Sequence, residues 1–342
     1  MTVAVARPAG GRTEPRRRGH PALRVASLYV PTLVVVVALV FALPRAMPGD
    51  PLSVFDDPDS AVFVSDADSR QRLLDYYGLD DPLGEQFARY VSRVARGDLG
   101  WSIARHAPVS ELIGQHLPWT LLLMGTSLAL AAVASFVAGV ASAWRRGRPA
   151  DRGLLVSLTA VNAVPEYAIA AVLLIVFAVV FPVFPLYGAR SPFSDARGAA
   201  AVADVAEHLV LPAGALTLSL LGTKFLLVRN TVLSSLGQDY MLLARAKGLP
   251  ERALKYRHAG RNALLPFVTV LGIQAGFAAG GSVFVESVFS YPGMGTLILR
   301  AVDARDYPVL EASFLVLAVV VLVVNLAVDL LYARLDPRVA AE

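Results

Sequence analysis

Six long apolar stretches constrain this chain more than any other feature of its sequence. A helix that crosses a membrane needs about 20 mostly apolar residues. Six segments meet this length with at most one charged side chain each: 25–44, 117–144, 153–189, 209–228, 262–285 and 312–333. The third is predicted to supply one helix that ends near Pro182. Of the 342 residues 56% are hydrophobic and 17% are charged, so apolar side chains must face lipid. The sequence predicts an all-α polytopic membrane protein with six transmembrane helices.

The distribution of Lys and Arg predicts on which side of the membrane each loop lies. With both termini in the cytoplasm, nineteen Lys and Arg fall on the cytoplasmic side and eleven on the outer side, as the positive-inside rule requires. The tail 1–24 is then cytoplasmic, and its Arg, Pro and Gly content predicts disorder. Residues 45–116 form an external loop, residues 117–338 hold the other five spans, and residues 339–342 end the chain in the cytoplasm.

The external loop 45–116 has apolar residues at helical spacing in two places. The two predicted faces consist of Leu73, Leu74 and Tyr77, and of Phe87, Tyr90, Val91 and Val94. We expect two short amphipathic helices on the outer surface. Packing against the bundle accounts for these faces more simply than a dedicated binding role.

Motifs for catalysis and for metal or nucleotide binding are missing from the sequence. The chain has no cysteine, which excludes disulfides, thiolate metal sites and cysteine nucleophiles. It also lacks a phosphate-binding glycine–lysine loop, an HExxH helix, a Gly-x-Ser-x-Gly elbow and a dinucleotide glycine fingerprint. We expect a chain that is not an enzyme and holds no cofactor or metal of its own. If it uses chemical energy, another chain must supply it.

Residues 229–261, between the fourth and fifth apolar segments, form the most informative loop. Asp239 is predicted to N-cap a short helix over 240–247. Lys247 in the last turn and Gly248 after it are typical of a helix end. One face of this helix is predicted to carry Tyr240, Leu243, Ala244 and Lys247.

The second half of this loop predicts another short helix over 251–259, with Pro250 suited to its first turn. Its cations can enforce the topology of the chain or rest against anionic lipid. Neither role accounts for the small residues in the segment 244–249, which suit a knob that fits a groove in a partner protein. From the residues alone, docking and a purely topological role both stay open.

Motifs along most of the chain resemble the permeases of ABC importers, and among them the dipeptide/oligopeptide/nickel family. Segment 240–250 is similar to the EAA loop of these permeases, although Leu242 and Leu243 replace the first two residues of the EAA triplet. The other motifs, in chain order, are 47–51, 77–80, 97–102, 118–120, 257–258, 261–266, 286–295, 305–308 and 336–338. Their order and spacing cover about residues 25–338. They most resemble the B-type permease, a binding-protein-dependent transport inner-membrane component with the larger first external loop.

The resemblance implies a type I ABC importer permease fold and alternating-access transport of peptides or similar small solutes across the cytoplasmic (inner) membrane. The implied partners are a second permease subunit (a heterodimer is favoured), two cytoplasmic ABC ATPase subunits that bind ATP and Mg, an extracytoplasmic solute-binding protein and membrane lipid, but no nucleic acid. The sequence does not identify the solute. The alternative function is a membrane receptor or assembly scaffold whose cytoplasmic loop recruits a partner without transport.

The resemblance also implies that the loop 229–261 is a coupling element, which sits in a cleft of the ATPase and transmits its closure to the spans. The expected coupling residues are Tyr240, Leu243, Ala244, Arg245, Ala246, Lys247, Gly248 and Leu249. Gly248 is the most informative of them, because another residue there would have to adopt a left-handed backbone conformation.

Further residues in or beside the spans are candidates for the translocation path or for helix packing: Glu166, Lys224, Gly272, Gly276, Gly280 and Glu286. The glycines recur every four residues, which suits either static packing or a moving helix interface. Glu166 can line a polar path or pair with Lys224. For Glu286, a carboxylate at the outer membrane interface is a simpler interpretation than a gate or a contact to a substrate amine.

Overall fold

The computed structural model describes residues 21–46 and 81–335, with the backbone alone at 21–28, 275–282 and 331–335. The described chain is mostly helical. Its α-helices are α1 (Pro21–Arg45), α4 (Leu83–Ala95), α5 (Val109–Trp144), α6 (Pro149–Asn162), α7 (Glu166–Leu174), α8 (Ala199–Leu236), α9 (Asp239–Ala246), α10 (Gly260–Val288), α11 (Met294–Asp303) and α12 (Tyr307–Leu335). Two π-helical segments, η1 (Ile175–Val180) and η2 (Ala253–Ala259), continue α7 and precede α10.

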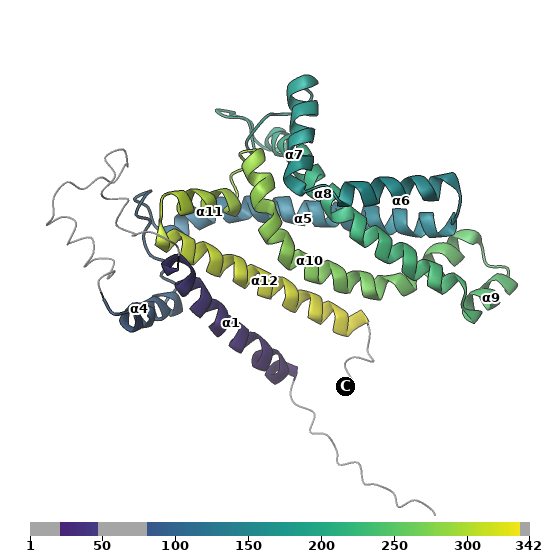
Figure 1. Ribbon diagram of the computed structural model, residues 1–342, viewed down its shortest axis with the longest axis horizontal. Coiled ribbons are helices and arrows are strands. Elements are labelled where there is room, and N and C mark those ends of the chain that lie inside the picture. The colour runs from purple at the N-terminus through teal and green to yellow at the C-terminus, as the bar shows by residue number, and fades with distance from the viewer. Residues whose placement is uncertain (1–20, 47–80, 336–342) are drawn as a thin grey trace, which may run out of the picture.

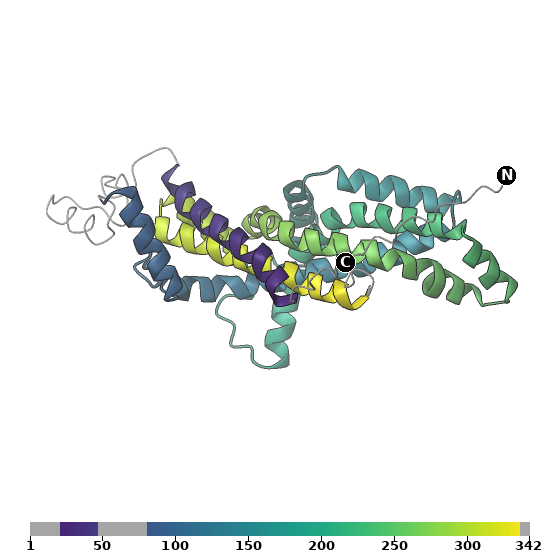
Figure 2. The ribbon, with the colours of Figure 1, turned by 90° about the horizontal axis from the view of Figure 1, so that it is seen from below.

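The helices form an elongated bundle with two distinct ends (Figure 1). At one end lies α9, and at the opposite end lie α11 and α4. We call them the α9 end (residues 140–152 and 229–262) and the α11 end (residues 81–120, 182–208 and 286–311). In both views α1 and α12 lie side by side (Figures 1 and 2). There, Tyr29 Oη donates a hydrogen bond to Asp329 Oδ2 at 2.8 Å.

Among the described residues, three helices are long and apolar enough to cross a membrane: α5, α8 and α12 over Tyr307–Leu330. The pair formed by α6 and α7–η1 is a fourth if the two halves make one span. Several helices begin before the predicted apolar segments; α5 starts at Val109 rather than at residue 117, because helical hydrogen bonding continues into the more polar flanking turns. The protein is an all-α polytopic membrane protein, whereas the count of six spans stays a prediction.

The third predicted span is not one helix. Its two halves, α6 and α7–η1, are bent by 101° relative to each other at a short break. The break lies at 163–165, where Pro165 lacks an N–H group and disfavours helical backbone at the residue before it. The prediction of a single helix was therefore wrong, although the end of the second half at Val180 agrees with the expected end near Pro182.

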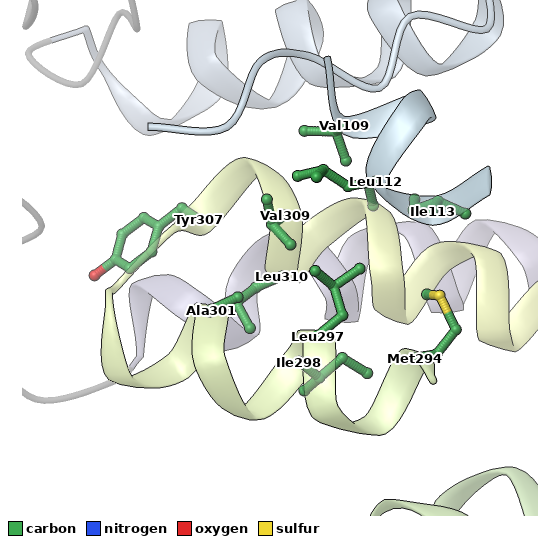
Figure 3. Close-up of a cluster of buried hydrophobic side chains, with 11 residues drawn as sticks. Val109, Leu112, Ile113, Met294, Leu297, Ile298, Ala301, Tyr307, Val309 and Leu310 are labelled. Atoms are coloured by element: carbon green, nitrogen blue, oxygen red, sulfur yellow. The ribbon is translucent and has the colours of Figure 1, made fainter. Parts of the chain in front are cut away.

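The helix α11 was not expected, and it organises the α11 end. Its apolar side chains pack against the first turns of α5 and α12 (Figure 3). The buried cluster consists of Val109, Leu112, Ile113, Met294, Leu297, Ile298, Ala301, Tyr307, Val309, Leu310 and Ala312. The signal was present in the sequence, because Met294, Leu297, Ile298 and Ala301 follow the spacing of one helical face.

Within the predicted loop 45–116 the structure has α4, which agrees with the second of the two predicted amphipathic helices; the first, around residues 73–77, lies outside the described residues. Tyr90 of α4 is buried, and Phe87 packs edge-on against Phe41 of α1 with ring centroids 5.2 Å apart. Arg45, at the end of α1, forms an ion pair with Glu311 of α12. It also donates a hydrogen bond to a side chain of α4. The helix α4 therefore packs against the bundle, as the simpler interpretation expected. The predicted tails 1–24 and 339–342 lie outside the described residues, except that α1 already begins at Pro21.

Candidate functional site

The helix α9 begins and ends at residues that set its backbone locally. It starts at Asp239 with Gln238 as the N-cap, so the prediction that Asp239 is the N-cap was wrong by one residue. Asp239 lies in the first turn instead, where its carboxylate faces the positive end of the helix dipole. Beyond the other end Gly248 has a φ of +68°, the left-handed conformation that glycine adopts without strain. The predicted helix end at Lys247 and Gly248 is confirmed.

Two side chains anchor α9 to the bundle. Met241 is fully buried and Ala244 is 6% exposed, and Leu249 packs beside them in part. They share an apolar cluster with residues of α5, α8, η2 and α10: Val140, Ala143, Val228, Val232, Leu254, Ala259, Ala263 and Phe267. Protein interiors are close-packed and transmit strain. This cluster therefore connects α9, together with η2, to three long helices.

The remaining side of α9 is exposed. Leu242 and Leu243 are 60% and 57% exposed. The other exposed residues of this surface, which we call the α9 face together with the two leucines, are Tyr240, Arg245, Ala246, Lys247 and Gly248. The predicted shared face is thus divided, because Ala244 enters the core while Tyr240, Leu243 and Lys247 do not. Residue spacing alone did not show that Met241 is the main anchor.

The second half of the loop is not a separate helix. From Glu251 the chain runs through η2 directly into α10, without a break. The prediction of a short, independent helix over 251–259 was therefore wrong. Leu254 and Ala259 enter the same apolar cluster as α9, and this burial explains why the helical backbone continues into the span.

Two polar contacts hold the loop that contains α9, one at the segment after α9 and one at α9 itself. Trp144, the last residue of α5, donates its indole N–H to the Glu251 carboxylate. Asn262, near the start of α10, donates to Tyr240 Oη at 2.6 Å. The loop is therefore held by α5 and α10 on both of its sides.

A buried ion pair beside this cluster was not expected from the sequence. Arg229 donates Nε to Asp151 Oδ1 at 2.9 Å and a second nitrogen to Oδ2 at 3.0 Å. Ser142 Oγ and the backbone N–H of Gly147 also donate to this carboxylate, which is 2% exposed. These donors offset the desolvation of the charge and join α5, α6 and α8. The signal was that Asp151 is the one acidic residue in the cationic segment 145–152.

The candidate residues within the spans occupy different surroundings. Within the described residues, Glu166 and Lys224 do not form an ion pair: Lys224 is fully buried and donates Nζ to the Leu220 carbonyl at 3.0 Å. Glu166 is half-buried in the first turn of α7, directly after the break in the third span. A carboxylate at a helix break inside a membrane is a common feature of transport paths, and that role for Glu166 stays a prediction.

Of the three candidate glycines of α10, the structure describes the side-chain surroundings of Gly272 alone. A Cβ at Gly272 would lie 2.4 Å from Cγ1 of Val328 on α12, so this position is a close contact between two helices. Gly276 and Gly280 fall where only the backbone is described, and their packing lies outside the described side chains. The choice between static packing and a moving interface stays open.

Glu286 is fully buried within the protein, which its sequence context did not indicate, and its predicted position at the outer membrane interface stays a prediction. It accepts hydrogen bonds from Thr120 Oγ1 at 2.7 Å, from the Gly295 N–H at 2.7 Å and from the Thr296 N–H at 3.3 Å. The last two donors belong to the first turn of α11, whose N–H groups have no partner within the helix. The carboxylate is stabilised by these donors and by the helix dipole, and it ties α10, α5 and α11 together.

Comparison with known proteins assigns the chain to a family. The model for the family described as binding-protein-dependent transport system inner membrane component matches residues 135–341, which include the α9 face. The glutathione transport system permease protein of Salmonella paratyphi A is 36% identical over 311 residues, 91% of this chain and 95% of that protein. The oligopeptide transport system permease protein of Bacillus subtilis is 37% identical over 318 residues, 93% and 98% of the two chains. A putative peptide permease protein of Brucella ovis is 37% identical over 308 residues, 90% and 94%. The chain therefore belongs to the binding-protein-dependent transport system inner membrane components and is a permease subunit of an ABC importer.

Proposed function

We propose that this permease carries peptides across the inner membrane together with a second, different permease subunit. Two ABC ATPase subunits, which bind ATP and Mg, engage the α9 face, and an extracytoplasmic binding protein delivers the peptide. Both termini of the chain are cytoplasmic in this proposal, so that the α9 end faces the cytoplasm and the α11 end faces outward. The names of the three relatives support the substrate class.

The division of α9 into an anchored side and an exposed side is the observation that carries this proposal. Met241 and Ala244 are held in the core, while Leu242 and Leu243 are more than half exposed on the other side of the same short helix. Adjacent exposed leucines on a rigid helix are typical of a surface that a partner protein covers. A cleft in an ATPase subunit would bury both.

The anchoring contacts define how such a partner would act on the spans. Closure of the two ATPase subunits would displace α9, and the close-packed cluster around Met241 would pass this displacement to α5, α8 and α10. Two permease subunits that tilt together would then expose the path to one side of the membrane at a time. The ATPase-coupling residues therefore act as a rigid unit, and none of them takes part in chemistry.

The experiment compares Leu243→Ser with Leu83→Ser, a matched change of a leucine on α4 that is 65% exposed and lies outside the predicted spans. Both are assembled into the complete importer in proteoliposomes. Loss of an interface leucine costs about 1 kcal/mol or more when it is a binding hot spot, so Leu243→Ser should lower both ATPase co-purification and peptide uptake several-fold. Leu83→Ser should leave both unchanged. Normal uptake by the Leu243→Ser importer would contradict the proposal, and an assembled complex without peptide uptake would favour a scaffold.

A further inference from the structure

A cavity of about 500 Å³ opens at the α11 end, away from the α9 face. It is formed by three segments that are distant in the sequence: the beginning of α5, the loop after η1 and the turn between α10 and α11. The side chains that matter for its chemistry are Gln115, His116, Trp119, Arg190 and Ser290. Its volume lies within the range of about 300–1,000 Å³ that is usual for sites of small ligands.

The loop that carries Arg190 is held in place on both sides of this residue. The Gly188 N–H donates to the Phe289 carbonyl at 2.9 Å, which ties the loop to the end of α10. Ser191 donates its N–H and its hydroxyl to the two oxygens of Asp204 on α8, at 2.9 Å and 2.7 Å. The backbone of Arg190 is therefore positioned before any ligand arrives, which lowers the entropic cost of binding.

The charge of Arg190 is available to a ligand. Within the described residues the guanidinium of Arg190 makes no ion pair. The oxygens of Asp204 already accept from Ser191 and lie 3.5 Å from His208 Nδ1 at the nearest. A guanidinium offers paired N–H donors that match a carboxylate.

The opposite wall of the cavity is rigid and aromatic. The ring of Trp119 packs edge-on against Tyr291, with centroids 6.1 Å apart, and His116 is fixed by a 2.7 Å contact from Nδ1 to the Leu112 carbonyl. Gln115 adds an amide that can pair with a peptide group. A charged fork, an amide and an aromatic wall together suit a short peptide that ends in a carboxylate.

We propose that this cavity is an entry subsite in which Arg190 binds the C-terminal carboxylate of an incoming peptide. The inference rests on the proposed function, because it takes the solute to be a peptide and the α11 end to face outward. It goes beyond that function by assigning a specificity-determining residue to the permease itself.

The absence of cysteine from the chain permits a direct test by protection from a maleimide. Ser290→Cys places one thiol at the cavity. Ser194→Cys places a control thiol on the loop that carries Arg190, at an exposed residue that does not line the cavity. Gln115→Cys is a second cavity probe should Ser290→Cys fold poorly. The complete importer is labelled in the presence of tri-alanine, tri-alanine amide or S-methylglutathione, which has no free thiol to consume the maleimide. We expect tri-alanine or S-methylglutathione to slow labelling of the cavity thiol, and the amide to show no such effect. Labelling of the control thiol should be unchanged by all three.

Arg190→Gln in the Ser290→Cys background tests the guanidinium, with Arg197→Gln on the same loop as the matched control. Because a charge-assisted hydrogen bond is lost, Arg190→Gln should raise the peptide concentration for half protection about tenfold or more. Arg197→Gln should not change this concentration.

Equal protection by the amide, no protection by either free peptide, or unaltered protection in Arg190→Gln would overturn the subsite. Protection by the empty binding protein alone would identify a protein-docking surface instead. Failure of the unmutated importer to couple peptide to ATP hydrolysis would refute the proposed function, whereas the labelling reports on the cavity independently.

Discussion

The two ends of the bundle differ in whether their side chains find partners within this chain. At the α11 end the buried carboxylate of Glu286 is fully paired with donors from this chain. Asp306 accepts in the same manner from Ser102 and from the Ala104 N–H. At the α9 end the core is equally well packed, but Leu242 and Leu243 remain exposed beside basic residues. The buried carboxylates of the α11 end are thus satisfied within one chain, whereas the α9 face exposes the two leucines that the proposed ATPase contact would cover.

This comparison predicts that changes at the α11 end unfold the structure, whereas changes on the α9 face leave the fold intact and remove only the coupling. Polar groups buried in a close-packed region have no water to replace a lost partner. Exposed side chains keep their hydration when they are changed, so their effect on stability is small.

The largest expected loss of stability is that of Glu286→Gln, which tests whether the buried carboxylate holds the α11 end together. The amide cannot replace the carboxylate as acceptor for three donors, and removal of one partner from a buried charged network costs about 3–5 kcal/mol. The thermal unfolding of the purified chain in detergent should shift markedly to lower temperature. Glu207→Gln, an exposed carboxylate on α8, is the control and should have no effect; equal unfolding temperatures would show that Glu286 is not a structural centre.

A smaller loss of stability is expected for Gly272→Leu on α10. The new side chain would collide with Val328, and overpacking of this kind costs about 1–3 kcal/mol. Adding Val328→Ala should restore part of the unfolding temperature if the two residues are in direct contact.

At Gly276, where the side-chain surroundings are not described, Gly276→Leu separates two roles. Poor assembly of the importer supports static packing, and normal assembly with lost transport supports a moving interface.

The smallest effect on the fold is expected for Gly248→Glu, which tests whether the α9 end serves coupling rather than stability. A residue with a side chain costs about 1–2 kcal/mol in the left-handed conformation, and the open surroundings of Gly248 permit the local distortion. Membrane insertion should therefore be normal while peptide uptake is abolished. Gly248→Asn, which tolerates this conformation, should retain uptake. Uptake at the unmutated rate by the Gly248→Glu importer would exclude a role of this turn in coupling.

Much of the local structure could be predicted from the sequence. Apolar length and helical spacing placed the segments that became α1, α5, α8, α10 and α12, and the pair Lys247–Gly248 located the turn after α9. These features depend on neighbouring residues along the chain, which is why reading the sequence could find them. The family resemblance that the motifs indicated is confirmed by the comparison with known permeases.

Other features depend on residues that meet only in the folded chain. Glu286 follows an apolar run and reads as an interfacial carboxylate, yet it is buried because Thr120, 166 positions away in the sequence, and the start of α11 supply its donors. Spacing on α9 did not distinguish the anchor Met241 from the exposed Leu243, since both are apolar. Reading the sequence located the long apolar segments and the turn after α9, but neither α11 nor the break in the third span. The tertiary structure alone decided which polar groups are buried and which apolar groups stay exposed, because the cost of burying a charge depends on partners that no local pattern records.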